Sequence, residues 1–232
     1  RPCRREAAHR GGGLSMGMSI SAEQNAAAVA AAVTAAEEAW SALGVVAEAV
    51  NHTAGHGFAF LRLTVPATHV LTVAKGLKHD MAVNYCSMIT GTHFPEGDDD
   101  RGWEVAYHMQ RMPVSNPEPN TSHVLVAGDL SGMDMPLEIE MLVPLPQGDD
   151  PRVPSVQSVW RGADWNEKET WDLVGIKFDG HDNMFRVLNP HDSPDGFHPL
   201  QKQHKIRYHD FNEMYDDAQG FVRKPVDEGR VK

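Results

Sequence analysis

The amino-acid sequence predicts an α+β fold in which helices cover one face of a mostly antiparallel sheet. The early part of the chain has apolar residues at helical spacing, whereas several later segments alternate apolar and polar residues, as strands with one wet face do. A helix, a strand and a helix are followed by several strands joined by short turns, an order typical of α+β proteins. With 232 residues, 41% of them hydrophobic, the chain can form one sizeable core with tails, but hardly two full domains.

The first helix is predicted from about Ser21 to Leu43. Ser21 and Gln24 have the spacing of a capping box, in which each side chain accepts a hydrogen bond from the other residue's backbone. Apolar residues then recur at helical spacing within Ala-rich sequence, at Val29, Val33, Ala36 and Trp40. Residues 1–20 are expected to be a disordered leader, either translated upstream sequence or the remnant of a targeting segment.

Four strands are predicted where apolar and polar residues alternate, at about 57–65, 82–90, 102–109 and 137–143. The last is the clearest, because its apolar positions alternate with Glu138 and Glu140. Pro66 ends the first strand, and a short helix is expected to follow from about Thr68. Residues 112–136, rich in Pro, Asn, Ser and Gly, are interpreted as an inserted loop or a long hairpin.

A well-marked helix is predicted in the second half of the chain. Asp164 can cap its start, Glu167 can complete the capping box, and Gly175 is a suitable end. This helix is the last element of the α+β domain that we expect over residues 21–175.

The rest of the chain, residues 176–232, is interpreted as an extended arm that binds a partner. Its few aliphatic residues cannot bury enough apolar surface to offset the entropy lost on ordering. A chain that ends at Ile176 is therefore expected to fold but not to assemble with partners. Large apolar residues are nevertheless spaced along the arm like anchors for a partner surface. They are Phe178, Met184, Phe185, Leu188, Phe197, Leu200, Phe211 and Tyr215.

Composition excludes several classes of function. The formal net charge of −11 repels phosphate backbones, so nucleic acid is not expected as a partner. The two cysteines, Cys3 and Cys86, do not have the spacing of a metal site. No stretch approaches the roughly 20 apolar residues of a membrane-spanning helix, and no Gly-rich nucleotide-binding motif occurs. We expect no metal, cofactor or catalytic residue in this chain, and no membrane span.

One long run of residues carries a specific resemblance. It reads DDPRVPSVQSVWRGADWNEKETWDLVGIKFDGHDNMFRVL from Asp149, and GFHPLQK follows it up to Lys202. This run resembles the signature of the C subunit of NADH-quinone oxidoreductase, which is the 30-kDa subunit of respiratory complex I. Related subunits of membrane-bound hydrogenases and coenzyme F420-linked dehydrogenases share the pattern. The resemblance extends weakly back to about Pro66 and so covers well over half of the chain.

The resemblance implies a structural role without catalysis by this chain alone. FMN, iron–sulfur clusters and quinone would be bound by other subunits of the complex. The partners would be the large subunit that forms the quinone pocket and the small subunit that carries the terminal iron–sulfur cluster. The chain would support electron transfer from NADH to quinone, coupled to ion translocation. It would lie at the cytoplasmic face of the cell membrane, or on the matrix side in a mitochondrion.

The residues that keep the family pattern are expected at the partner interface. They are Trp165, Glu167, Glu169, Asp172, Gly175, Gly180, His181, Arg186, His198, Pro199 and Lys202. The charged residues of the predicted helix would meet basic groups of a partner, or else form a solvated face with local pairs. Gly180 is expected to allow a turn that His181 fixes by a hydrogen bond. Arg186 and Lys202 would bind partner carboxylates or cap backbone carbonyls.

Three alternatives remain open. The same structural role would suit a membrane-bound NiFe hydrogenase or an F420-linked dehydrogenase, in which the electron donor differs. The chain would otherwise be a free-standing adaptor, or a stand-alone metal-binding hydrolase that uses Asp192 or Asp210. The histidines for such a metal site are His181, His191, His198, His204 and His209. Their spacings do not place neighbours on one helix face, which disfavours the metal site.

Overall fold

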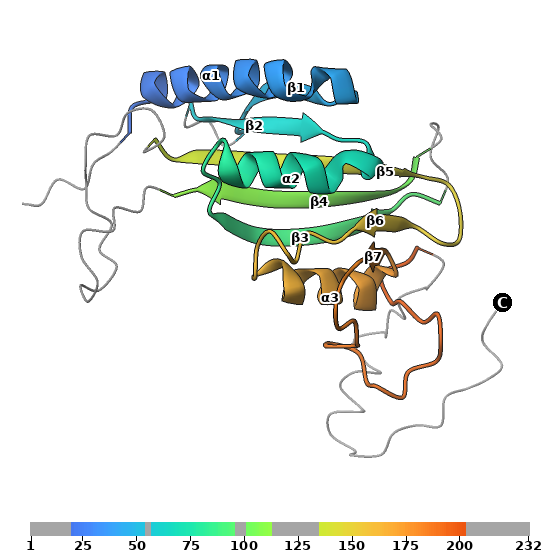
Figure 1. Cartoon of the computed structure of the whole chain (residues 1–232). Helices are drawn as coiled ribbons and strands as arrows, with labels where there is room; N and C mark the ends of the chain where they lie inside the picture. Colours follow the sequence, from blue (N-terminus) through green and yellow to red (C-terminus); the bar gives the residue numbers. More distant parts are fainter. Residues whose placement is uncertain (1–19, 54–56, 96–100, 113–134, 203–232) are drawn as a thin grey trace, which may run out of the picture. The chain divides into compact units, whose positions relative to one another are not determined.

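The computed structural model of the chain describes residues 20–53, 57–95, 101–112 and 135–202 (Figure 1). The helices are α1 (Ala22–Trp40), α2 (Val70–His79) and α3 (Ala163–Val174), with short 3-10 turns at Ser41–Leu43 and Ala67–His69. The strands are β1 (Val46–Asn51), β2 (Ala59–Thr64), β3 (Tyr85–His93), β4 (Arg101–Arg111), β5 (Leu137–Pro146), β6 (Arg152–Pro154) and β7 (Lys177–Asp179). The first compact unit of the chain extends to Gln201.

Five strands form the main sheet, in the order β1-β2-β5-β4-β3. The pairs β1–β2, β5–β4 and β4–β3 are antiparallel, whereas β2 and β5 run parallel. In this register Ile139 lies opposite Leu61 on one side and Met109 on the other, so their side chains share one face. Strands β6 and β7 form a separate parallel pair. The predicted α+β class with a mostly antiparallel sheet is confirmed.

The helices pack on one face of the main sheet, and the core lies between the helices and this face. Leu61, Tyr107 and Ile139 point toward the helices and are fully buried. In α3, the Thr170 hydroxyl donates a hydrogen bond to the Ile89 carbonyl of β3, with 2.8 Å between the oxygens. Burial of each large aliphatic side chain stabilises the fold by about 1.5–3 kcal/mol. This apolar layer is therefore the main source of stability. Figure 1 shows α2 in front of the sheet and α1 along its β1–β2 edge.

Helix α1 begins as predicted. The Ser21 hydroxyl accepts a hydrogen bond from the Gln24 backbone, and the Gln24 side chain accepts one from the Ser21 backbone, so the capping box is present. The buried side of the helix consists of residues at helical spacing, namely Val29, Ala32, Ala36 and Trp40. Trp40 is the last residue of α1, and it packs against α2, where its ring fills the space beside Gly76.

Strand β1 was not predicted from the sequence. It is an edge strand with half-buried and exposed residues only, and its Val46 side chain is 60% exposed. Two of its six residues are alanines, Ala47 and Ala49, which contribute little to an apolar alternation. Gly44 precedes it with a φ of +76°, a conformation that glycine adopts without strain.

The predicted capping box of α3 is wrong, although the helix itself is confirmed. The helix begins at Ala163 after Gly162, no side chain caps it, and Asp164 lies in its first turn. Glu167 does not reach back to the helix start, because its carboxylate is buried and accepts hydrogen bonds from an earlier segment. Gly175 ends the helix as predicted, with a φ of +91°.

Several predictions fall outside the described residues. The leader at 1–20 is described only at Ile20, and the insertion at 112–136 only at its two ends. Of the predicted arm, residues 176–202 are described, and residues up to Gln201 belong to the same compact unit as the sheet. Within the described ranges, no helix combines the length and the apolar character needed to cross a bilayer.

Candidate partner interface

Asp172 is the centre of a hydrogen-bond network that fastens the chain after β7 onto α3. Its fully buried carboxylate accepts hydrogen bonds from the backbone N–H groups of Val187, Leu188 and Asn189 at 2.8–3.0 Å. The Asn189 amide and one Arg186 nitrogen add bonds of 2.9 and 2.8 Å. Burial alone would raise the pKa of Asp172, but the hydrogen bonds from Asn189, Leu188 and Arg186 outweigh it and hold the pKa well below its usual range.

Arg186 was predicted to bind partner carboxylates or to cap backbone carbonyls, and in the structure its acceptors lie within this chain. It pairs with the Asp172 carboxylate at 2.8 Å, and it donates hydrogen bonds to the carbonyls of Phe197 at 3.0 Å and Pro194 at 3.1 Å. Its guanidinium also lies 5.6 Å from the centre of the Trp171 ring, within the range of a cation–π contact. Arg186 therefore holds the segment that follows β7 in one conformation.

His198 and Pro199 close this segment over the end of α3. His198 is buried, and its Nδ1–H donates to the Asp172 carbonyl at 3.0 Å. The Gly175 position lies directly beneath, because a side chain there would approach the His198 ring to 2.7 Å. Pro199 is half-buried next to His198, and Lys202 is exposed at the end of the described segment.

Glu167 anchors the other side of α3. It is fully buried, and its two carboxylate oxygens accept hydrogen bonds from the Ser155 hydroxyl at 2.6 Å and the Val156 backbone at 2.7 Å. Burial raises the pKa of Glu167 to about 7, although the Ser155 and Val156 hydrogen bonds lower it. Cys86 lies on the same side of the core, and burial raises the pKa of its thiol to about 12. A thiol with this pKa stays protonated and unreactive.

Lys168, Gly180 and His181 also have internal partners. The Lys168 ammonium pairs with Asp164 at 3.0 Å and lies 4.4 Å from the centre of the Phe185 ring. Gly180 has a φ of +86°, which confirms the predicted turn conformation. His181 donates from Nε2 to the Asp164 carbonyl at 3.2 Å, and its Nδ1 accepts from a backbone N–H. His181 therefore fixes the turn, as predicted.

Four large apolar side chains are exposed around this network, and we call them the α3 face: Trp165, Phe185, Leu188 and Leu200. Their exposed fractions are 50%, 39%, 55% and 53%. Trp165 lies on α3, where its indole N–H donates to the Glu169 carboxylate at 2.6 Å. The Phe185 ring lies against an ammonium group of α3. The Leu188 and Leu200 backbones donate hydrogen bonds to α3 at 2.8 and 2.9 Å, so the backbone that carries these two side chains is held against α3.

The predicted interface residues thus fall into two groups. Trp165 and Lys202 are exposed, and Glu169 is half-buried. The other charged residues of the pattern are used inside the fold, where they position the α3 face. The expected anchors of the arm divide in the same way, because Phe178 is buried whereas Phe185, Leu188 and Leu200 are exposed.

Sequence reasoning missed Asn189, which binds Asp172 through both its backbone and its side chain. The signal that could have found it is the Asn189-Pro190 pair, since such a dipeptide favours a turn. A turn at this point brings successive backbone N–H groups together, and a carboxylate can accept hydrogen bonds from several of them.

The histidines do not form a metal site in the part of the chain that the structure describes. Within these ranges no group of three or more His, Cys, Asp or Glu side chains is arranged to hold a metal ion. His204, His209 and Asp210 lie outside the described residues. The metal-binding hydrolase is therefore not supported by His181, His191 and His198.

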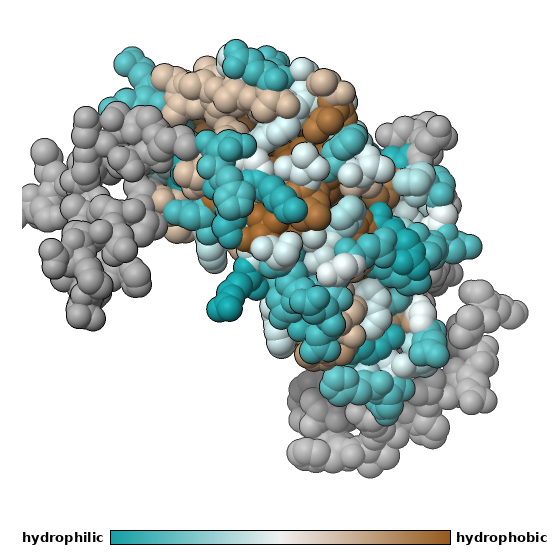
Figure 2. Space-filling view, in the orientation of Figure 1, coloured by the Kyte–Doolittle hydropathy of each residue, from teal (hydrophilic) through white to brown (hydrophobic). Residues whose placement is uncertain are grey.

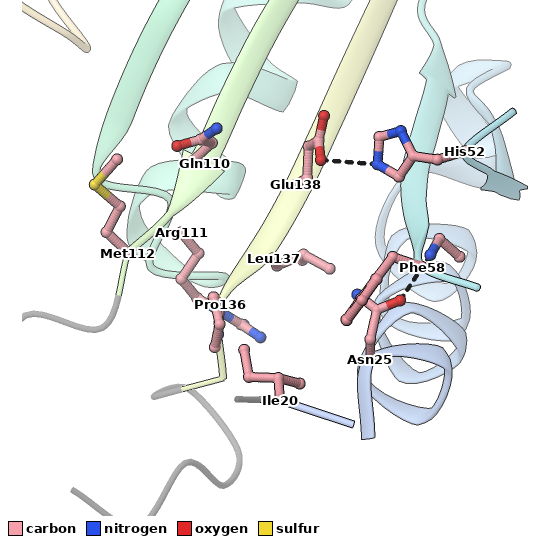
Figure 3. Close-up of a pocket in the computed structure, with 11 residues that line it drawn as sticks. Ile20, Asn25, His52, Phe58, Gln110, Arg111, Met112, Pro136, Leu137 and Glu138 are labelled. Carbon is pink, nitrogen blue, oxygen red and sulfur yellow. Dashed lines mark hydrogen bonds and ion pairs between the residues drawn. The ribbon is translucent and has the colours of Figure 1, made fainter. Parts of the chain in front are cut away.

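A cavity of about 500 Å³ lies beside the start of α1, at one end of the sheet (Figure 3). Its polar groups are largely paired, since Asn25 accepts a hydrogen bond from the Ala59 backbone at 2.7 Å and His52 lies 3.0 Å from a Glu138 oxygen. A second hollow of about 500 Å³ is lined by alanines of α1 and by Met81. It lies on the helix-covered side, where Figure 2 shows hydrophobic surface surrounded by hydrophilic residues.

Comparison with known proteins gives one matching family. The family model described as "Respiratory-chain NADH dehydrogenase, 30 Kd subunit" matches residues 63–210. The C subunit of NADH-quinone oxidoreductase from Moorella thermoacetica is 31% identical over 145 residues, which are 62% of this chain and 80% of the relative. The C subunit from Chloroherpeton thalassium is 46% identical over 69 residues, 29% of this chain and 28% of the relative.

The C subunit from a Nocardioides species is 30% identical over 139 residues, 59% of this chain and 46% of the relative. The chain therefore spans less than half the length of the Chloroherpeton and Nocardioides relatives. Among solved structures, a chain of the membrane-bound sulfane sulfur reductase, an archaeal respiratory membrane complex, is 18% identical with a TM-score of 0.50. The match covers 80% of this chain and 89% of that one, and it is a likeness of fold alone.

Proposed function

Because the chain belongs to the family of the 30 Kd subunit of respiratory-chain NADH dehydrogenase, we propose that it is a cofactor-free structural subunit of the quinone-reducing module. In this role it supports electron transfer from NADH to quinone, coupled to ion translocation, and the reaction belongs to the whole complex. FMN, the iron–sulfur clusters and the quinone are bound by partner subunits. The chain is peripheral, at the cytoplasmic face of the cell membrane or on the mitochondrial matrix side.

The α3 face is the observation that carries this proposal. Leu188 and Leu200 each expose more than half of their side chains, although the backbone of each is held by a hydrogen bond to α3. Large apolar side chains left in water cost free energy, which contact with another protein recovers. A surface that is ordered before binding also loses less conformational entropy on association.

The proposed partners of the α3 face are the large subunit that forms the quinone pocket and the small subunit that carries the terminal iron–sulfur cluster. Aromatic anchors such as Trp165 contribute strongly to protein interfaces, because they bury a large area with little loss of rotamer freedom. Glu169 accepts the Trp165 indole hydrogen bond and fixes the ring orientation. Lys202, two residues after Leu200 in the sequence, is suited to a partner carboxylate.

The proposal is tested by affinity purification of the tagged chain from gently solubilised membranes, followed by mass spectrometry. The wild-type chain should recover both proposed partners, and the accompanying flavoprotein or hydrogenase chains would identify the electron donor. The double variant L188D/L200D should recover at least tenfold less of both. The matched control A26D/A30D, which adds the same charge to exposed positions of α1, should behave as wild type. Recovery of the wild-type chain alone would refute the proposal.

A further inference from the structure

We propose that the sheet has a second docking surface, on the face away from the helices, for a partner protein whose contact surface is basic and apolar. We call it the open sheet face, and it consists of Val46, Glu48, Arg62, Tyr85, Met88, Arg101, Glu104, His108, Glu138 and Glu140. This inference rests on the proposed function, because it gives the same structural subunit a second partner. Among the described elements, no helix covers this face.

The strand register defines the open sheet face. Buried and half-buried residues alternate along β2, β4 and β5, and the buried ones point toward the helices. The other side chains therefore share the opposite face. One row crosses the five strands in the order Glu48, Arg62, Glu140, His108 and Met88. The row contains both charged and apolar groups.

Acidic groups outnumber basic ones on this face. Arg62 lies between two carboxylates, with 2.6 Å from its Nε to Glu140 and 3.5 Å from its Nη1 to Glu48. Arg101 pairs with Glu104 at 2.7 Å. With the histidines counted as neutral, four carboxylates therefore face two guanidinium groups.

Glu138 is the fourth carboxylate, and two histidines share it. Its oxygens lie 3.0 Å from His52 and 2.7 Å from His108. Figure 3 shows the side chains of Glu138 on β5 and of His52, the residue after β1, turned toward each other across β2. About a third of the Glu138 side chain is exposed. A carboxylate offers about four acceptor positions, so Glu138 keeps acceptor capacity for donors of a partner.

Apolar side chains lie at both edges of the same face. Val46 on β1 is 60% exposed, and Tyr85 and Met88 on β3 are 48% and 50% exposed. An acidic centre between exposed apolar edges is complementary to a protein surface that combines Arg or Lys with apolar residues. A second copy of the chain would bring the same acidic centre against this one, and like charges repel. The occupant that fits is therefore a different, basic protein.

The two docking surfaces lie on opposite sides of the sheet. Helix α3, which carries the α3 face, packs on the covered side through Thr170 and Ile89, whereas the open sheet face lies on the other side. A rigid domain with one partner on each side fixes the distance between them. The structural role would then be to hold two other subunits at a fixed distance from each other.

The test is affinity purification of the tagged chain with the double variant E48K/M88K, whose two added ammonium groups would repel a basic partner. Glu48 and Met88 are exposed, and the change leaves the Arg62–Glu140 pair in place. The matched control E38K/A30K makes equivalent changes on exposed positions of α1. We expect E48K/M88K to lose at least one subunit by tenfold or more while it retains those lost by L188D/L200D, and we expect the control to retain all.

Each outcome decides the inference. If wild type, E48K/M88K and the control recover the same subunits in the same amounts, the open sheet face is not a docking surface. If wild type recovers no subunit of the complex, the proposed function fails first. A photo-crosslinker in place of Met88 provides a second measurement, because it does not depend on the variant's assembly. Crosslinks to a basic subunit support the inference, whereas crosslinks only to residues of this chain or to a second copy overturn it.

Discussion

Burial acts to raise the pKa of both buried carboxylates of α3, but their hydrogen bonds make the outcomes opposite. Glu167 receives two hydrogen bonds from the chain, and burial raises its pKa to about 7. Asp172 is also buried, but five hydrogen bonds from the segment after β7 hold its pKa well below the usual range. The number of hydrogen-bond donors decides whether the pKa rises or falls, because each hydrogen bond to the carboxylate favours its charged form and opposes the effect of burial.

Replacement of Glu167 by Gln should remove a pH dependence of stability. Between about pH 4.5 and 7 the unfolded Glu167 is ionised while the folded one holds its proton, so the folded state binds more protons and stability falls as pH rises. The loss reaches at most about 3 kcal/mol above pH 7, since one pKa unit corresponds to about 1.4 kcal/mol. Urea unfolding at pH 5, 6.5 and 8 should show a flatter profile for E167Q than for wild type or the exposed control E37Q. Equal slopes in all three proteins would contradict this.

Replacement of Asp172 by Asn should lower the free energy of unfolding by about 3 kcal/mol at pH 7. The Asn amide nitrogen would meet donors in place of an acceptor oxygen. Hydrogen exchange at Val187–Asn189 should accelerate, whereas D192N, an exposed control, should change stability by less than about 0.5 kcal/mol. Because the folded pKa of Asp172 is depressed, its contribution is present above about pH 4 and is lost as pH falls further. A D172N protein as stable as D192N would exclude this role.

Single residues were predicted best where backbone conformation decides the residue type. Gly175 and Gly180 were recognised because glycine accepts positive φ without strain. The role of Glu167 was missed, since its partner Ser155 lies 12 residues earlier and the pairing depends on how β6 meets α3. The internal role of Asp172 was missed for the same reason, because its donors begin 14 residues later.

At the level of elements, the two glycines that follow α3 allow the stability cost of backbone strain to be measured separately from the cost of lost packing. Gly175 and Gly180 both have positive φ, but a side chain at Gly175 would approach His198 to 2.7 Å, whereas nothing lies within 4 Å of the Gly180 position. G180A should therefore cost about 1 kcal/mol of stability from strain alone. G175A should cost at least about 2 kcal/mol more, because the His198 segment must shift. Denaturant unfolding checks this, and equal costs would show that packing contributes nothing.

The segment that follows α3 changes the expectation for truncated chains. A chain that ends at Ile176 lacks Phe178, which is buried, and lacks every donor that Asp172 has after β7. It should melt at least about 8 °C lower than wild type or fail to fold. A chain that ends at Lys202 keeps all of these contacts and should melt within a few degrees of wild type. Equal melting temperatures of the two truncations would show that residues 177–202 do not stabilise the domain.

Elements with strong periodicity were predictable, and short or edge elements were not. Strand β5 alternates buried and half-buried residues along its whole length, so its pattern is unambiguous. Strands β6 and β7 have three residues each, too few for a period to show. The start of α3 was misjudged because Asp164 and Glu167 fit the capping-box spacing, while tertiary contacts used Glu167 elsewhere.

At the level of the whole molecule, the fold class follows from the order of elements, but the surfaces do not. The sheet and its helices required only local patterns, whereas the α3 face depends on a segment that folds back onto α3 through Asp172. The open sheet face depends on which strands are neighbours, and the parallel pairing of β2 with β5 has no local signature in the sequence. Both surfaces are proposed docking sites for other subunits, and the proposed function of the chain depends on its assembly with them.

The central claim, that the α3 face contacts the subunits of the quinone-reducing module, is tested most directly by crosslinking in the intact complex. A photo-crosslinker in place of Leu200, which is 53% exposed, is activated in solubilised membranes, and the crosslinked protein is identified by mass spectrometry. We expect the large quinone-pocket subunit or the small iron–sulfur subunit. An intact complex in which Leu200 crosslinks to neither of these subunits would contradict the account.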